Sequence, residues 1–271
     1  MNIECLCPKT RLQFQSQIAS LEQFASYPWG NDYFKIDHGN DYFAFFDRLG
    51  EVDYYVCLSE QRQVLAVGAG ILRTVRDRPT ASSQATWYLC DLKVHPQHQN
   101  QRLSLRLLRH AIILGQPRCD RGYSISMDPV PGQPSPWIRI LEKLSILPFR
   151  YSCALNLYSL GADNLTEILP NLQQIYGKIG YRSLRGKKDL RLQRTHSNIP
   201  LLHLEWGDAL LDEENLFWEP FPGYLHLFCT PIGSPISQHL SNQSIVPSGT
   251  ASVVSRGMEE CDWNFIMTSE I

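Results

Sequence analysis

The chain has 271 residues, which is long enough for one large domain or for two modest ones. Hydrophobic residues make up 43% of it and charged residues 19%, so it can bury a substantial core, and wholesale disorder is excluded. Its 25 basic and 27 acidic residues give a formal net charge of −2. This near balance provides no overall attraction to nucleic acid or to an anionic membrane, so we expect neither as a partner.

The sequence shows no membrane or export signal. Its apolar runs, such as Val64–Leu72, fall far short of the ~20 residues that a spanning helix needs, and no basic flank precedes an apolar stretch at the N-terminus. We therefore expect a cytoplasmic protein. Its eight cysteines include no Cys-x-x-Cys pair, which predicts free, buried thiols and no metal site. A metal or redox role for Cys5 and Cys7 is the alternative.

Taken in chain order, residues 1–160 combine helical and strand patterns. Apolar residues at helical spacing predict helices over residues 12–24, 42–49, 101–114 and 137–144. Branched and aromatic runs predict strands over residues 54–58, 64–75, 86–94, 122–127 and 150–160, the first two as a hairpin. The strand–helix–strand steps predict an α/β (α+β) fold with a mixed, partly parallel sheet flanked by helices.

The pattern changes after residue 160. A helix is predicted over residues 165–179, and strands over Tyr224–Cys229 and Trp263–Thr268, within a stretch rich in Pro, Gly and Ser. The basic run Arg182–Arg194 is either a phosphate or nucleic-acid site or, as is commoner, a solvated edge. We therefore divide the chain into a domain of residues 1–160 and a C-terminal extension of residues 161–271.

The most informative segment runs from Leu89 to Leu108. A strand ends at Val94, and a tight polar loop leads from it into a helix with a strong apolar face. The first amides of a helix lack an internal acceptor, and the helix dipole places partial positive charge beside them. Such a loop can wrap a diphosphate with backbone N–H groups. The segment therefore favours an anion site, and an ordinary connection without a ligand is the alternative.

This segment resembles the central signature of the GNAT acyltransferase superfamily. The signature is a strand, Val-x-Pro, then Arg/Gln-x-x-Gly-x-Gly/Ala and a helix with paired leucines. Val94-His95-Pro96 and Leu107-Leu108 match it, and Gln99 takes the first loop position. Arg102 stands where the family has Gly, and Ser104 where it has Gly or Ala. The Arg102 side chain therefore points to solvent, contacts a phosphate or blocks the site.

The resemblance covers about residues 10–160 and implies a GNAT-like fold. It also implies transfer of an acetyl group from acetyl-CoA to an amine of a small molecule or peptide. The residues that would then bind acetyl-CoA are Leu92, Lys93, Val94, Gln99, Asn100, Gln101, Arg102, Leu103 and Ser104. Backbone N–H groups at the first three of these would stabilise the oxyanion. The family often has a tyrosine that protonates the thiolate of coenzyme A at the position of Leu141, so that role has no candidate there.

Two side chains of the central strand are catalytic candidates. Asp91 is the only acid in this strand and could act as a general base. The alternative is a structural carboxylate that pairs with Lys93 or with an arginine. Tyr88 is a candidate acid, with simple packing as the alternative. Side chains alternate along a strand, which puts Asp91 and Lys93 on one face. The other face would carry Cys90, Leu92 and Val94.

The sequence therefore predicts an N-acyltransferase of the GNAT type. Two alternatives belong to other classes of protein. One is a degenerate GNAT-like domain that binds coenzyme A without turnover, and the other is an interaction protein that uses the aromatic C-terminal region. A homodimer is the candidate assembly.

Overall fold

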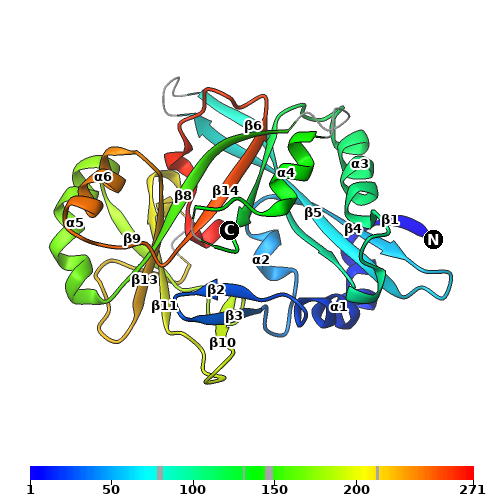
Figure 1. Cartoon of the computed structure of the whole chain (residues 1–271), viewed down its shortest axis with the longest axis horizontal. Coiled ribbons are helices and arrows are strands. Elements are labelled where there is room, and N and C mark those ends of the chain that lie inside the picture. The colour runs from blue at the N-terminus through cyan, green and yellow to red at the C-terminus, as the bar shows by residue number, and fades with distance from the viewer. Residues whose placement is uncertain (78–81, 131, 144–148, 212–213) are drawn as a thin grey trace.

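In the part of the chain that the structure describes, one mixed sheet has eleven strands, which come from both the N-terminal and the C-terminal parts of the sequence (Figure 1). The structure is a computed structural model that describes residues 1–77, 82–130, 132–143, 149–211 and 214–271. The strands of this sheet are, in spatial order, β1 (Asn2–Leu6), β4 (Glu51–Leu58), β5 (Val64–Asp77), β6 (Ser82–Val94), β7 (Gly122–Met127), β14 (Gly249–Arg256), β8 (Arg150–Leu160), β13 (Leu225–Pro231), β11 (Leu201–Trp206), β9 (Ile179–Arg182) and β12 (Leu216–Phe217).

Among the described residues, a three-stranded sheet and six helices complete the fold. The small sheet has the order β10 (Asp189–Leu192), β3 (Asp32–Asp37) and β2 (Tyr27–Trp29). The helices are α1 (Pro8–Glu22), α2 (Ala44–Asp47), α3 (Leu103–Gly115), α4 (Pro136–Lys143), α5 (Ala162–Tyr176) and α6 (Pro235–Asn242), with short 3-10 turns at η1 (Pro96–His98), η2 (Gly207–Leu211), η3 (Trp263–Phe265) and η4 (Thr268–Glu270). In the part of the chain that the structure describes, no helix has both the length and the apolar character needed to cross a membrane.

The predicted mixed sheet is confirmed. Strand β6 pairs with β7 in parallel, as β11 does with β13, whereas the hairpin of β4 and β5 is antiparallel. The predicted strands over residues 122–127 and 150–160 coincide with β7 and β8. The last residue of the helix predicted over 137–144 lies outside the described residues.

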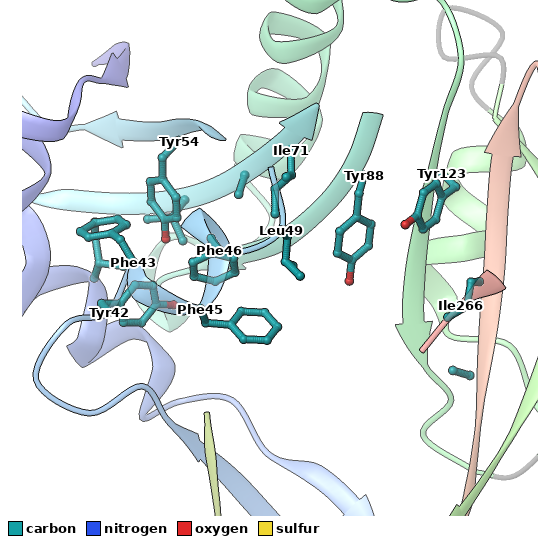
Figure 2. Close-up of a cluster of buried hydrophobic side chains, with 14 of the residues drawn as sticks. Tyr42, Phe43, Phe45, Phe46, Leu49, Tyr54, Ile71, Tyr88, Tyr123 and Ile266 are labelled. Atoms are coloured by element: carbon teal, nitrogen blue, oxygen red, sulfur yellow. The ribbon is translucent and has the colours of Figure 1, made fainter. Parts of the chain in front are cut away.

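Helices cover both faces of the sheet. Alternate residues of β4 point to opposite sides, as strand geometry requires. Tyr54 and Val56 belong to the cluster with α1 and α2, whereas Tyr55 and Cys57 pack with Leu103 and Leu107 of α3. The first cluster is strongly aromatic, with Tyr42, Phe43, Phe45 and Phe46 gathered beside the sheet (Figure 2). A second large core lies between α5, α6 and the strands β8, β9, β11 and β13.

Strand β14 was not predicted, although it is buried. It comes from residues 161–271 but lies between β7 and β8, so Val253 faces Ile125 on one side and Cys153 on the other. Its small hydroxyl residues gave a loop-like composition. In the fold, Thr250 and Ser252 each donate to the buried carboxylate of Asp128 at 2.6 Å. The domain boundary at residue 160 stays a prediction, and the two parts that it separates share this sheet.

The predicted strand over Trp263–Thr268 is wrong. The chain folds there into the short turns η3 and η4. The reason is local, because the Asp262 carboxylate accepts the backbone N–H of Asn264 at 3.0 Å and bends the chain into a 3-10 turn. Further on, Glu270 forms an ion pair with Arg73 of β5, which holds this segment against the sheet.

Candidate functional site

Strands β6 and β7 separate in the middle of the sheet. They pair in parallel over three positions, the last of which joins Leu89 to Ser124. Beyond this position both strands line one cavity of about 450 Å³, with residues 90–94 on one side and residues 125–127 on the other. Where two strands part, backbone groups on their inner edges lose their ladder partners and need another one. The opening is therefore a place where a ligand can meet the backbone.

A β-bulge at Asp91 shapes this opening. Ala69 of β5 faces Cys90 and Val67 faces Lys93, so Asp91 and Leu92 together oppose the single residue between Val67 and Ala69. Asp91 accordingly has a φ of +55°, in the left-handed region. A bulge adds one residue to a strand and shifts the alternation of its side chains.

The bulge corrects the predicted faces of β6. Asp91 and Lys93 do share a face, as predicted. Cys90, however, packs against the aromatic cluster on that same side, whereas Leu92 and Val94 pack towards α3. The prediction failed for Cys90 because it assumed an unbroken alternation. The result is that Cys90, Asp91 and Lys93 can all contribute to one side of the sheet.

Asp91 lies at the centre of a buried charge network. Its Oδ2 accepts hydrogen bonds from Tyr54 Oη at 2.5 Å and from Tyr42 Oη at 3.0 Å, and its carboxylate forms an ion pair with Lys93. Lys93 Nζ also lies 2.5 Å from Oε2 of Glu22 at the end of α1. These contacts are those of a structural carboxylate. The catalytic role of Asp91 stays a prediction.

The protonation of this network follows from burial and pairing. Burial by itself would lower the pKa of Lys93, but the charges of Asp91 and Glu22 outweigh it and hold that pKa well above its ordinary value. Burial raises the pKa of Glu22, and it raises the pKa values of Tyr42 and Tyr54 well above 10. Lys93 is therefore a permanent cation here, and both tyrosines stay protonated.

His38 extends the network to the cavity wall. Its ring centre lies 4.3 Å from that of Tyr42, and its Nε2 lies 3.8 Å from Glu22 Oε2. Burial lowers the pKa of His38 to about 4. The imidazole is therefore neutral at pH 7 and adds no charge to the pair of carboxylates.

The rest of the cavity wall is mostly apolar and comes from distant segments. The small sheet and α2 place several aromatic side chains around it, namely Tyr27, Trp29, Phe34, Phe45 and Phe46. Lys188, just before β10, and His203 of β11 complete the wall, together with Thr268 of η4. His203 Nδ1 lies 3.0 Å from Thr268 Oγ1, and burial keeps the pKa of His203 well below its ordinary value.

Tyr88 is in the cavity wall but is held by packing. It is 3% exposed and stacks on Tyr123 of β7, with ring centres 5.0 Å apart (Figure 2). Burial raises its pKa well above 10, so the phenol keeps its proton at neutral pH. Its predicted role as an acid stays a prediction.

The predicted acetyl-CoA residues divide into three groups. Leu92, Lys93, Val94 and Ser104 line the cavity. Gln99, Asn100, Gln101 and Arg102 form the exposed loop that precedes α3. Leu103 is 1% exposed and anchors the first turn of α3 in the core. The predicted site is therefore assembled from the cavity edge, a surface loop and one supporting core residue.

The loop takes a backbone path that usually needs glycine. Asn100 has a φ of +66° and Arg102 a φ of +57°, both in the left-handed region. Arg102 is the residue that precedes the first turn of α3, and its side chain is exposed. The substitution of Gly by Arg at this position therefore leaves the turn in the conformation that glycine favours. The loop leads directly into the first turn of α3, whose first amides lack an acceptor within the helix.

Several residues of the site were not predicted. Glu22, His38 and Tyr42 lie in segments that gave only packing signals, and they reach the site through the fold. Lys188 lies within the predicted basic run, but nothing in the sequence distinguishes it from Lys187, which points outwards and lies 3.3 Å from Glu214.

The cysteines and metal ligands can be described briefly. All eight cysteines are free thiols, with Cys57 and Cys229 buried. Cys5 and Cys7 are exposed, contrary to the prediction of buried thiols. No cluster of three or more His, Cys, Asp or Glu side chains suited to a metal ion occurs among the described residues.

Comparison with known proteins gives distant likenesses. No family model matches the chain. Protein L340 of Acanthamoeba polyphaga mimivirus, itself uncharacterized, is 24% identical over 238 residues, which is 86% of this chain and 68% of that protein. Among solved structures, a conserved protein of unknown function from Enterococcus faecalis is 8% identical with a TM-score of 0.48, covering 95% of this chain and 73% of that chain.

Two acetyltransferases of known structure are also similar. The ribosomal-protein-S18-alanine N-acetyltransferase of Escherichia coli is 18% identical with a TM-score of 0.37, over 56% of this chain and 79% of that chain. An acetyltransferase of the GNAT family from Staphylococcus aureus is 12% identical with a TM-score of 0.34, over 55% of this chain and 83% of that chain.

Proposed function

We propose that this protein is an acyltransferase that moves an acetyl group from acetyl-CoA to an amine of a small molecule or peptide. The observation that carries the proposal is the opening between β6 and β7, with the first turn of α3 at its edge. Val94 from the strand and Ser104 from the helix line the same cavity. A thioester in the opening and a diphosphate at the helix can therefore belong to one ligand.

The loop before α3 is the proposed site for the diphosphate. The first amides of α3 have no acceptor within the helix, and the helix dipole favours an anion beside them. The left-handed conformations of Asn100 and Arg102 support a backbone path that wraps such a group. Because the Arg102 side chain is exposed, its guanidinium is free to add a charge-assisted contact to a phosphate.

The inner edge of β6 is the proposed site for the thioester carbonyl. The N–H of His95 donates to the carbonyl of Leu65 in β5 at 2.8 Å. Successive amides of a strand point in opposite directions, so the N–H of Val94 is directed away from β5 and towards the opening. A fixed backbone donor at this place would stabilise the oxyanion that forms during acyl transfer.

The aromatic part of the cavity is the proposed acceptor site. A volume of about 450 Å³ is within the usual size of small-molecule sites. Its walls are apolar apart from a few titratable groups, which suits an amine carried on an apolar body or a peptide end. The amine has to lose its proton before it can attack, so the site needs a proton acceptor.

Calorimetry with acetyl-CoA tests the donor site. The wild type should bind with micromolar affinity. Ser104→Trp places a large side chain at the edge of the opening and should abolish binding. Ser16→Trp, on the exposed face of α1, is the matched control and should bind as the wild type does. Unchanged affinity in Ser104→Trp, or no binding by the wild type at millimolar ligand, would refute the assignment.

A second candidate function is binding of coenzyme A without turnover. It is favoured by the contacts of Asp91, whose carboxylate already pairs with Lys93 and accepts hydrogen bonds from two tyrosines. Transfer assays with a panel of amines separate the two functions. Acetylated product above the background of the Ser104→Trp variant indicates an enzyme, whereas binding without any product indicates the degenerate domain.

A further inference from the structure

Lys188 places an amine in the wall of the cavity. Its backbone N–H donates to Leu184 at 2.8 Å in the turn that leads to β10, and its side chain reaches inwards to Phe45. The Nζ atom lies 4.7 Å from the centre of the Phe45 ring. The next cavity-lining residue of this segment, Leu190, is apolar and buried. The amine thus lies against an aromatic ring in the cavity wall.

The charges around Lys188 do not offset the cost of burying its ammonium form. The groups that interact with it electrostatically are Glu22 of α1, His38 just after β3, Arg48 after α2, Cys90 and Lys93 of β6, and His203 of β11. Glu22, the only carboxylate among them, is held by Lys93 at 2.5 Å. Within the described residues, no ion pair reaches Nζ of Lys188. Burial, reinforced by the cation of Arg48, lowers the pKa of Lys188 to about 7.

The other titratable groups of the cavity are poorly suited to moving a proton at neutral pH. Asp91 is engaged by Lys93 and by two tyrosines. Burial raises the pKa values of Tyr88 and Cys90 and lowers those of His38 and His203. These four groups are therefore fixed in their neutral forms. Lys188 is the group that exchanges a proton readily in the range where a general base is most effective.

We propose that Lys188 is the proton-transfer residue of the acyl transfer, and this assignment rests on the acyltransferase function proposed above. The neutral Nζ takes a proton from the ammonium form of the acceptor. The free amine then attacks the thioester carbon, so that the C–N bond forms and the C–S bond breaks. The departing thiolate takes the proton from Nζ and leaves as the thiol. The second proton of the amine nitrogen passes through the same Nζ to water.

The position of Leu141 shows why this role needs a residue from elsewhere. In the resemblance described above, a tyrosine at this position would protonate the thiolate. Leu141 has no titratable group, is 2% exposed and packs in an apolar cluster with Leu108 and Phe149. Lys188 enters the cavity from a different part of the chain and can supply that proton.

Two substitutions and a neighbouring control test the assignment. Lys188→Met keeps most of the apolar stem of the side chain but removes the amine, and it should lower kcat/KM for an amine acceptor by about 10²–10⁴-fold. Lys188→Arg should be equally inactive, because a guanidinium does not lose its proton in proteins. Lys187→Met removes the adjacent lysine, which lies outside the cavity wall, and should leave kcat/KM unchanged.

The pH profile distinguishes proton transfer from a structural role. In the wild type, kcat/KM should rise with pH through about 7, because the neutral amine is the active form. Any residual activity of Lys188→Met should lack this rise. Trace labelling of the intact protein with isotopic acetic anhydride, followed by peptide mass spectrometry, reports the same titration without any assay of activity. Labelling of Lys188 should be half-maximal near pH 7.

The outcomes separate the two proposals. A wild type that transfers acetyl groups, together with a Lys188→Met variant of equal kcat/KM, overturns the role of Lys188 alone. Labelling of Lys188 that begins only above pH 9 overturns it as well. A wild type that binds no acetyl-CoA overturns the acyltransferase function and, with it, this assignment. Loss of transfer in Lys188→Met with unchanged acetyl-CoA affinity supports both.

Discussion

Lys93 and Lys188 line the same cavity, yet their protonation differs sharply. Both lose hydration through burial, which disfavours the cation in each case. Lys93 gains two carboxylate partners, Glu22 and Asp91, and its pKa rises well above the ordinary value. Lys188 has an aromatic ring and a nearby arginine instead, and its pKa falls to about 7. The partner, more than the burial, decides whether a buried lysine is a permanent cation or a proton carrier.

The comparison predicts that removing the two amines has unequal effects on stability. Lys93→Met leaves two buried carboxyl groups without their cation and should lower the free energy of unfolding by about 3–5 kcal/mol. Lys188→Met removes an amine that has no carboxylate partner, so it should lower the free energy of unfolding far less than Lys93→Met does. Urea unfolding at pH 7 measures both variants. Equal losses would show that the partners do not set the difference between the two lysines.

Asp91 offers a second test of the Lys93 network. Asp91→Asn keeps a hydrogen-bond acceptor for Tyr54 and Tyr42 but removes the negative charge beside Lys93. We therefore expect the free energy of unfolding, measured with urea, to fall by about 1–3 kcal/mol. Acetyl transfer should persist if Lys188, as proposed above, is the residue that moves the proton. Asp53→Asn, a surface partner of Arg118, is the control. A fall in kcat of more than about 10²-fold with little loss of stability would instead show that Asp91 is the catalytic base.

The pH dependence of stability sharpens the comparison for Lys188. Its pKa is about 7 in the folded chain and ~10.4 in the unfolded chain, so between these values the unfolded chain binds more protons. The free energy of unfolding of the wild type should therefore rise with pH relative to Lys188→Met. The slope should be at most about 1.4 kcal/mol per pH unit, and it should vanish below pH 7. Urea unfolding of both proteins from pH 6 to pH 9 provides the measurement, and parallel curves would contradict a lowered pKa.

Much of the fold could be predicted from local patterns. Strands β7 and β8 and the hairpin of β4 and β5 have strong branched or aromatic runs, and the sequence placed them correctly. Strand β14 was missed because its small Ser, Thr and Gly residues resemble a loop. Its burial depends on hydrogen bonds to Asp128 and on neighbours that come from other parts of the chain. No local pattern contains that information.

Among the residues of the site, only those in β6 and around the loop before α3 could be predicted from the sequence. The contact between Asp91 and Lys93 follows from their spacing, and the loop before α3 follows from its signature. Lys187 and Lys188 are adjacent in one basic run, yet one lies near Glu214 and the other lines the cavity. The direction of each side chain is set by the turn before β10 and by the packing of the small sheet. Residue type and spacing do not encode that choice.

Substitution of Glu22 should have the smallest effect on stability. Glu22 interacts with both lysines, because it pairs with Lys93 and acts electrostatically on Lys188. Burial raises its pKa, so its charge is already disfavoured, and Glu22→Gln leaves Lys93 with Asp91 as its partner. We expect this variant to lower the free energy of unfolding, measured with urea, by about 1 kcal/mol or less. Glu4→Gln, which removes an exposed ion pair, is the control.

The same Glu22→Gln variant should lower the pKa of Lys188. The charge of Glu22 raises the pKa of Lys188, so its removal should shift the midpoint of Lys188 labelling to lower pH. The direction of this shift is the decisive measurement, because loss of a nearby negative charge lowers the pKa of an amine, whereas looser packing with more hydration would raise it. A midpoint that stays in place would mean that Lys93 already neutralises Glu22 completely. A loss of stability as large as that of Lys93→Met would make Glu22, and not Asp91, the main partner of Lys93.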